Sequence, residues 1–273
     1  MKTLIATTLA LVVLPATAHA DVPALDFEWT ATYGASATDN DGLDSGRDPF
    51  EIVFDQGSSA GDVLTNYAQS GSIAAEIVGQ FILYRDDVSS SVSQRNTFHA
   101  VGTSANDVLR QMTGVAANPP GVDASLDETL DRSINAVLSG TNWLVNHHPD
   151  AVLVQWTLPD LTMAPMFEAL PPTEVSNMQA HILRINDEIW TLDAHDNVIV
   201  VDFYAFMHDM AAAPPVLRGV TVYPEDLYVD NKHPNALGNA LAANEIISRI
   251  NDELGTTIPL LTEDELADIG GIP

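Results

Sequence analysis

Two short segments that are apolar almost throughout constrain the fold of this chain more than any other feature. They are Ala151–Leu158 (AVLVQWTL), which runs into Pro159 and Asp160, and Asn197–Phe203 (NVIVVDF). Thr97–Val101 is a shorter apolar run that leads into a cluster of Gly, Ser, Thr and Asn. Segments of this kind are typical of strands that are buried on both faces of a parallel sheet.

Helical patterns separate these strands. Apolar residues recur at helical spacing in 73–84 (IAAEIVGQFILY), and Ser125 with Glu128 has the form of a capping box at the start of a second helix. The longer predicted helices are Leu126–Leu144, Val175–Leu192 and Asn235–Leu254. Buried strands that alternate with helices predict an α/β domain with helices on both faces of the sheet. In such sheets the functional residues lie in loops beyond the carboxyl ends of the strands.

The N-terminus predicts a secretory signal peptide. Lys2 precedes the apolar run LIATTLALVVLP, and the tripeptide AHA that ends at Ala20 has the small-x-small form of a cleavage site. The run is too short to span a bilayer, and the chain has no cysteine for lipid attachment, so we expect no stable membrane anchor. We expect residues 1–20 to be removed and residues 21–273 to fold as one domain, secreted to the periplasm or the extracellular space.

The charge of the chain limits its partners. It has 10 Lys+Arg against 38 Asp+Glu, a formal net charge of −28, and such a surface repels nucleic acid and anionic membranes. Because screening weakens this self-repulsion, we predict a source that lives in salt water or brine. Equal thermal stability in dilute buffer and in molar salt would contradict that prediction. The lack of cysteine excludes disulfides, thiolate metal sites and a cysteine nucleophile.

A polar segment near the C-terminus predicts a general base. Asp230 stands three residues before His233, and Pro234, Asn235 and Gly238 follow. At this spacing a carboxylate can hold one imidazole nitrogen and leave the other as a base. Asn235 is a suitable cap for the helix that is predicted to begin there.

Further segments complete an ordered pattern. Gly34–Asp39 (GASATD) contains Ser36, Asn66–Ser72 (NYAQSGS) contains Gly71, and Phe98–Asp107 (FHAVGTSAND) contains Asn106. With the C-terminal D-x-x-H-P-N-x-x-G segment, and in this order, they resemble the sequence blocks of the SGNH (GDSL-like) serine hydrolases. The stretches Leu153–Phe167 and Val198–Met210 resemble the lipase-type branch of that family.

This resemblance implies a fold and a reaction. The fold is a three-layer α/β sandwich with a mostly parallel, flavodoxin-like central sheet. The implied catalytic residues are Ser36 as nucleophile, His233 as base and Asp230 as its partner. The implied oxyanion hole combines the backbone N–H groups of Ser36 and Gly71 with the side chain of Asn106. The reaction is hydrolysis of a small-molecule or lipid carboxylic ester through an acyl-enzyme, with no metal and no cofactor.

Two departures from the family pattern leave alternatives open. Ala35 replaces the Asp that ordinarily precedes the serine, and Ser104 replaces a Gly before Asn106. One alternative is a carbohydrate esterase that removes acetyl groups, because the same site serves both classes. The other is a binding protein on a catalytically degenerate scaffold of this family.

Three other motifs suggest competing sites. Gly57–Gly61 (GSSAG) matches the nucleophile-elbow pattern and makes Ser59 the rival nucleophile, provided that a strand precedes it and a helix follows. Asp39–Asp44 (DNDGLD) resembles part of a calcium loop without its closing Glu, and an acidic solvated loop is the favoured interpretation. His147 and His148 are adjacent and point in different directions, so they predict polar residues before a strand rather than a metal site.

Overall fold

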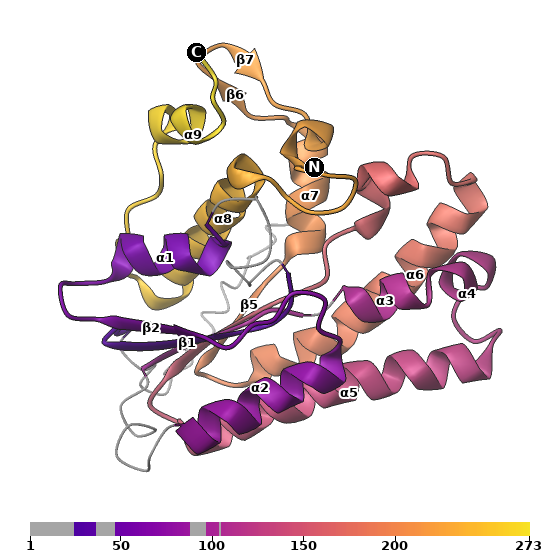
Figure 1. Cartoon of the computed structure of the whole chain (residues 1–273), viewed down its shortest axis with the longest axis horizontal. Helices are drawn as coiled ribbons and strands as arrows, with labels where there is room; N and C mark the ends of the chain where they lie inside the picture. Colours follow the sequence, from indigo (N-terminus) through magenta and orange to yellow (C-terminus); the bar gives the residue numbers. More distant parts are fainter. Residues whose placement is uncertain (1–24, 37–46, 88–96, 104) are drawn as a thin grey trace, which may run out of the picture.

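The computed structural model describes residues 25–36, 47–87, 97–103 and 105–273 (Figure 1). The predicted signal peptide and Ser104 lie outside the described residues. None of the described helices is long and apolar enough to cross a membrane.

Five parallel strands form the central sheet, in the order β2-β1-β3-β4-β5. They are β1 (Trp29–Tyr33), β2 (Val63–Asn66), β3 (Phe98–Val101), β4 (Val152–Trp156) and β5 (Val198–Val201). All residues of β3, β4 and β5 are buried, which explains why these strands are apolar apart from His99 and Gln155. The predicted strands were a few residues too long, because β4 ends at Trp156 and β5 ends at Val201, shortly before Phe203 begins a helix.

The helices are α1 (Pro49–Gly57), α2 (Ala74–Asp87), α3 (Asn106–Arg110), α4 (Met112–Ala117), α5 (Ala124–His147), α6 (Pro172–Ile189), α7 (Phe203–Ala212), α8 (Ala236–Leu254) and α9 (Glu263–Ile269). A small antiparallel hairpin joins β6 (Val216–Leu217) to β7 (Val220–Thr221). The predicted capping box of α5 was wrong: Asp123 caps this helix, and its carboxylate accepts from the N–H groups of Ser125 and Leu126. Helix α9, which follows α8, was not among the helices predicted from the sequence.

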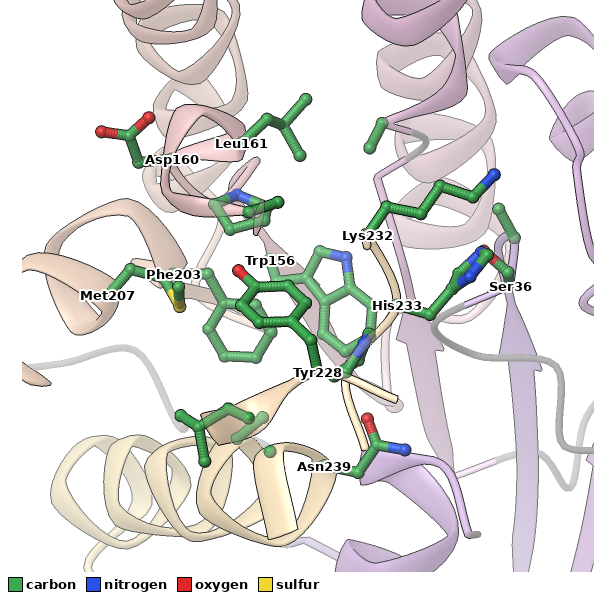
Figure 2. Close-up of a pocket in the computed structure, with 18 of the residues that line it drawn as sticks. Ser36, Trp156, Asp160, Leu161, Phe203, Met207, Tyr228, Lys232, His233 and Asn239 are labelled. Carbon is green, nitrogen blue, oxygen red and sulfur yellow. The ribbon is translucent and has the colours of Figure 1, made fainter. Parts of the chain in front are cut away.

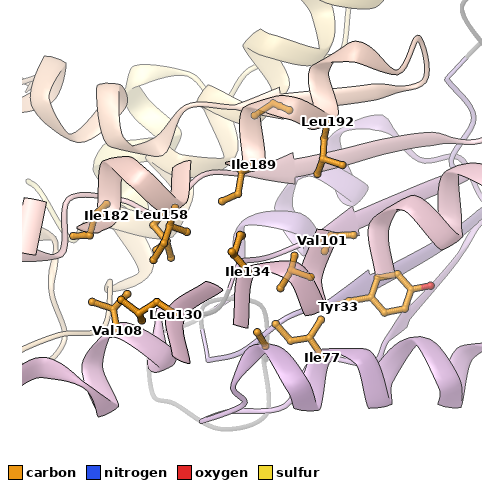
Figure 3. Close-up of a cluster of buried hydrophobic side chains, with 14 of the residues drawn as sticks. Tyr33, Ile77, Val101, Val108, Leu130, Ile134, Leu158, Ile182, Ile189 and Leu192 are labelled. Carbon is orange, nitrogen blue, oxygen red and sulfur yellow. The ribbon is translucent and has the colours of Figure 1, made fainter. Parts of the chain in front are cut away.

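The helices form one layer on each face of the sheet (Figure 1). Helices α2 to α6 pack on one face around a core that includes Tyr33, Ile77 and Leu130 (Figure 3). Helices α1, α7, α8 and α9 pack on the other face against side chains such as Phe98. Alternate apolar residues of β3, β4 and β5 therefore belong to different cores. The predicted three-layer α/β fold is confirmed.

The strand order determines where a ligand can bind. The chain moves from β1 to β2 on one side and then returns to β3 on the other side of β1. In sheets of this order, ligands bind beyond the carboxyl ends of the strands at the point where the order reverses, which here lies between β1 and β3. Ser36 lies just beyond β1 and Asn106 just beyond β3, so both belong to the loops at this point.

Candidate active site

The loop that carries Ser36 is fixed by a buried glutamine. Gly34 has a φ of 152°, a conformation that favours glycine, and it turns the chain out of β1. Gln80 of α2 accepts from the Gly34 N–H at 2.8 Å and donates to the Gly34 carbonyl at 2.8 Å. The Gln80 amide also donates to the Ser72 hydroxyl at 3.3 Å. A single side chain thus connects the loop after β1 to the segment after β2.

The segment after β3 is tied to the segment after β2. The Asn106 side-chain amide donates to the Ser72 carbonyl at 2.9 Å. The neighbouring Asp107 carboxylate accepts from the Ala74 N–H at 2.8 Å and from the Ser133 hydroxyl at 2.6 Å. Asp107 thereby satisfies an N–H in the first turn of α2, where a negative charge is favourable. These contacts explain why an Asn-Asp pair stands at this position.

The loop from 228 to 235 presents His233. The His233 ring shares a hydrogen bond of 2.7 Å between its Nδ1 and Asp230 Oδ2. The second carboxylate oxygen accepts from the backbone N–H groups of Lys232 at 2.8 Å and His233 at 2.7 Å. Since Asp230 occupies Nδ1, Nε2 is the ring nitrogen left to act as a base. The same loop is held at its far side, where the Met166 N–H donates to the Asn231 carbonyl at 2.9 Å.

The carboxylate of Asp230 is strongly acidic. Its limited burial raises the pKa, but the hydrogen bonds from the His233 ring and from the two backbone N–H groups outweigh this effect and lower the pKa to about 2. Asp230 is therefore ionised at neutral pH. An ionised partner stabilises the imidazolium that forms when the histidine takes a proton.

Helix α8 begins directly after this loop. Asn235 caps it, as predicted, by accepting from the Gly238 N–H at 2.9 Å, and the Asn235 amide donates to the Asp226 carbonyl at 2.7 Å. A side chain on Gly238 would meet the Leu227 carbonyl oxygen at 2.8 Å. The glycine is thus required for the close approach of α8 to the loop.

These loops enclose one side of a cavity of about 170 Å³ (Figure 2). Ser36, Asn106 and His233, which come from three distant parts of the sequence, all line it. The rest of the lining is mainly apolar and comes from β4, the turns after it, and α7; it includes Trp156, Leu161, Ala164, Met166, Phe167, Phe203, Phe206, Met207 and Met210. In Figure 2, Met207 and Phe203 lie on the side of the cavity opposite Ser36 and His233.

The predicted site residues differ in whether they line the cavity. Gly71 has a φ of 81°, which fits its place in a tight turn, but it does not line the cavity. Asn106 connects this turn to the cavity through its bond to Ser72. Among the described contacts, no hydrogen bond joins Ser36 to His233. Bonds of this kind are often long until a substrate is bound.

Comparisons of sequence identify no relative, since no protein-family model and no curated protein matches the chain. Solved structures do match. A lipase from a goat rumen metagenome aligns with a TM-score of 0.57 at 14% identity, over 82% of this chain and 97% of its own. A catalytic mutant of an acetylxylan esterase from Geobacillus stearothermophilus gives 0.54 at 16% identity, over 88% and 100%. A protein described as a GDSL-like lipase, from Parabacteroides merdae, gives 0.52 at 13% identity, over 86% and 98%.

Each match covers nearly the whole of the neighbour, so the likeness extends over the entire domain. The chain has the SGNH-hydrolase fold. At such low identities the likeness establishes the fold, and the activity has to be argued from the site.

Within this SGNH-hydrolase fold, one carboxylate that the sequence did not single out organises the cavity wall. Asp160 is buried and accepts from Thr162, from Gln179 of α6 at 2.8 Å and from His208 of α7 at 2.9 Å. Burial and the charge of Asp160 raise the pKa of Tyr204 and Tyr228 to about 12, so both phenols keep their protons. Asp160 thus fixes the turns that carry the apolar lining to two helices.

The competing sites do not fit this fold. Ser59 follows helix α1 and precedes strand β2, which reverses the strand-to-helix order of a nucleophile elbow, so it is not one. His148 is buried and shares a hydrogen bond of 3.0 Å with the Tyr84 hydroxyl. No group of three or more His, Cys, Asp or Glu side chains suited to a metal occurs in the described part of the chain. The calcium-like segment Asp39–Asp44 lies outside the described residues.

Proposed function

We propose that the protein hydrolyses carboxylic esters with Ser36, His233 and Asp230. The observation that carries this proposal is that Ser36, Asn106 and His233 line one cavity at the point where the strand order reverses. The Ser36 hydroxyl oxygen attacks the carbonyl carbon while its proton passes to His233. The C–O bond to the alcohol breaks, and His233 returns the proton to the leaving oxygen. Water then attacks the acyl-enzyme and loses a proton to His233. The bond between the acyl carbon and Ser36 Oγ breaks, His233 returns the proton to that oxygen, and the acid is released.

The charge that develops on the carbonyl oxygen needs hydrogen-bond donors. We assign this role to the backbone N–H groups of Ser36 and Gly71 and to the Asn106 amide, each worth about 3 kcal/mol in barrier height. Support comes from the contacts that tie these segments together through Ser72 and Gln80. Gly71 lies outside the cavity lining, so its part in the hole requires a small shift of the turn when substrate binds.

The acyl group that fits this site is apolar. Phe203, Phe206 and Met207 of α7 line the cavity together with Leu161 and Phe167, and burial of each methylene against such side chains contributes about 0.8 kcal/mol. This favours lipid-like or short-chain acyl esters. The second candidate, removal of acetyl groups from carbohydrate, has in its favour only the likeness to the acetylxylan esterase fold.

The test is a series of p-nitrophenyl esters from acetate to decanoate, measured beside an acetylated xylan. We expect kcat/KM to rise with chain length beyond acetate and Ser36→Ala to abolish turnover. A preference for acetylated xylan would favour the carbohydrate esterase. Absence of any turnover above background would mean that the chain is a binding protein on this fold.

A Met207→Trp variant provides a matched control for chain length. The larger Trp side chain should narrow the cavity at α7 and lower kcat/KM for the long esters by about tenfold. The kcat/KM for acetate should change little, because we expect the acetyl group not to reach α7. Equal effects on both esters would contradict this placement of the acyl chain.

We also propose export through residues 1–20, as the sequence predicts. Expression of the full sequence in a bacterial host should yield a periplasmic or extracellular product that begins at Asp21 by N-terminal sequencing. A product that retains Lys2 and stays in the cytoplasm would contradict it.

A further inference from the structure

Lys232 is the one lysine outside the predicted signal peptide, and its side chain lines the cavity beside the candidate base. In Figure 2 it extends on the same side of the cavity as Ser36 and His233, opposite Met207 and Phe203. In a chain with 38 acidic residues, a positively charged side chain in the cavity wall is unusual.

Most arginines of known placement have carboxylate partners. The ion pairs join Arg47 to Asp55, Arg184 to Asp127 and Asp131, Arg218 to Asp264 and Asp268, and Arg249 to Glu253. Lys232 takes part in no ion pair within the described residues. Its nearest acidic neighbour in sequence, Asp230, already binds the His233 ring and two backbone N–H groups. Among the described residues, no carboxylate therefore neutralises the Lys232 ammonium.

The position of Lys232 assigns it to one part of the substrate. The base that protonates the leaving oxygen is His233, so the alcohol part of the ester must lie near this loop, while the apolar cavity takes the acyl part. Lys232 precedes His233 directly, and its backbone N–H is fixed to Asp230 at 2.8 Å. Its stem therefore starts from a rigid point next to the leaving group.

We propose that Lys232 is a specificity-determining residue that binds an anionic group, a carboxylate or a phosphate, on the alcohol part of the substrate. This inference rests on the proposed ester hydrolysis and names its substrate class: an apolar acyl chain esterified to an anionic alcohol. A local cation is needed for such a substrate because the protein as a whole repels anions. A single ion pair near water is worth about a fivefold change in kcat/KM.

Two chromogenic esters that differ only in charge test the proposal, namely 3-butyryloxy-4-nitrobenzoate and 3-butyryloxy-4-nitrobenzamide. We measure the ratio of kcat/KM for the carboxylate over that for the amide. Lys232→Gln should lower this ratio about fivefold, mainly through KM, and Lys232→Arg should restore it. Arg132→Gln is the matched control. It removes one positive charge from an exposed position of α5, which does not line the cavity, and should leave the ratio unchanged.

A second pair, a monoacylglycerol and its 3-phosphate, identifies the anion through the rate of fatty-acid release. Dependence on Lys232 for both anions supports a general anion site, and dependence for the phosphate alone assigns a phosphate site. Ratios that Lys232→Gln leaves unchanged in both pairs overturn the inference, while turnover of the benzamide keeps the proposed function intact. Failure to hydrolyse any of the four esters would instead refute the proposed function itself.

Discussion

His233 and His99 have the same imidazole side chain but lie in different surroundings. His233 lies in a loop beyond the sheet, with a carboxylate 2.7 Å from its Nδ1 and a cavity beside it. His99 lies within β3, fully buried, and shares a hydrogen bond of 3.2 Å between its Nδ1 and the Tyr33 hydroxyl. Its ring centroid is 5.0 Å from that of His148.

The surroundings decide what each ring can do. Burial, and then the neighbouring His148, hold the pKa of His99 well below its usual range, so this ring stays neutral. Its Nε2 has no hydrogen-bond partner among the described residues. His233 has an ionised partner that stabilises its protonated form. The ring of His233 has a carboxylate at one nitrogen and lines a cavity, which is the arrangement that a catalytic base requires.

The largest expected effect separates the two rings directly. His233→Ala should lower kcat on an activated ester by about five orders of magnitude, because the serine loses its proton acceptor. His99→Leu, which keeps the site loops, should leave kcat within about threefold once the protein is confirmed folded by circular dichroism. If His99→Leu lost activity as completely as His233→Ala, the division between a catalytic and a structural histidine would fail.

Asp230→Asn tests the partner rather than the ring. The Asn side chain can donate to Nδ1, which would place the ring proton on Nε2 and block its action as a base. We expect kcat to fall by about four orders of magnitude, less than for His233→Ala, with KM nearly unchanged. Asp226→Asn, a carboxylate in the preceding turn, is the control and should keep wild-type kcat. A mild loss in Asp230→Asn would show that His233 is held by other contacts.

Strands β3 to β5, the four longest helices and the Asp-His end of the site could be predicted because their signals are local. Apolar runs mark β3 to β5, and the spacing of Asp230, His233 and Asn235 describes a bond and a cap within one short loop. The cap of α5 was misassigned because Ser125 and the true cap, Asp123, are both good caps two positions apart. Such a shift changes no packing and leaves no mark in the hydrophobic pattern.

The parts of the site that depend on distant contacts could not be predicted. Gln80 is an ordinary polar position in α2 by sequence, and only the fold brings it to Gly34. The cavity wall combines residues after β4 with residues of α7, and Asp160 joins them through Gln179 and His208. Ser59 shows the converse: its motif is complete in sequence, and the order of the elements around it is wrong.

Acid should destabilise the fold through the buried ring. The folded-state pKa of His99 lies below its unfolded value of about 6.5, so below that pH the unfolded chain binds a proton that the folded chain does not. Its contribution to stability is present above pH 6.5 and is lost on acidification, by at most about 1.4 kcal/mol per pH unit. The difference in unfolding free energy between the wild type and His99→Leu, from urea titrations between pH 7.5 and 5, measures it.

The unfolding free energies of the wild type and of His99→Leu have to be compared, because the pH dependence that Asp48 contributes to stability has the opposite sign to that of His99. Burial raises the pKa of Asp48 to about 7, so the folded state binds a proton between pH 7 and 4 that the unfolded chain releases. The slope of the wild type alone can therefore be flat. A difference that does not change with pH would mean that His99 accepts a proton in the folded state.

The smallest expected effect concerns the second buried ring. Tyr84→Phe removes the hydroxyl that lies 3.0 Å from His148 Nε2 and should lower the unfolding free energy by about 1 kcal/mol. Because Tyr84 and His148 lie away from the cavity lining, kcat/KM should stay within about twofold. Urea denaturation and ester hydrolysis on the same preparation give both values. A tenfold loss of kcat/KM without a loss of stability would show that the surroundings of the buried histidines affect ester hydrolysis. The distinction between a structural and a catalytic histidine environment would then not hold.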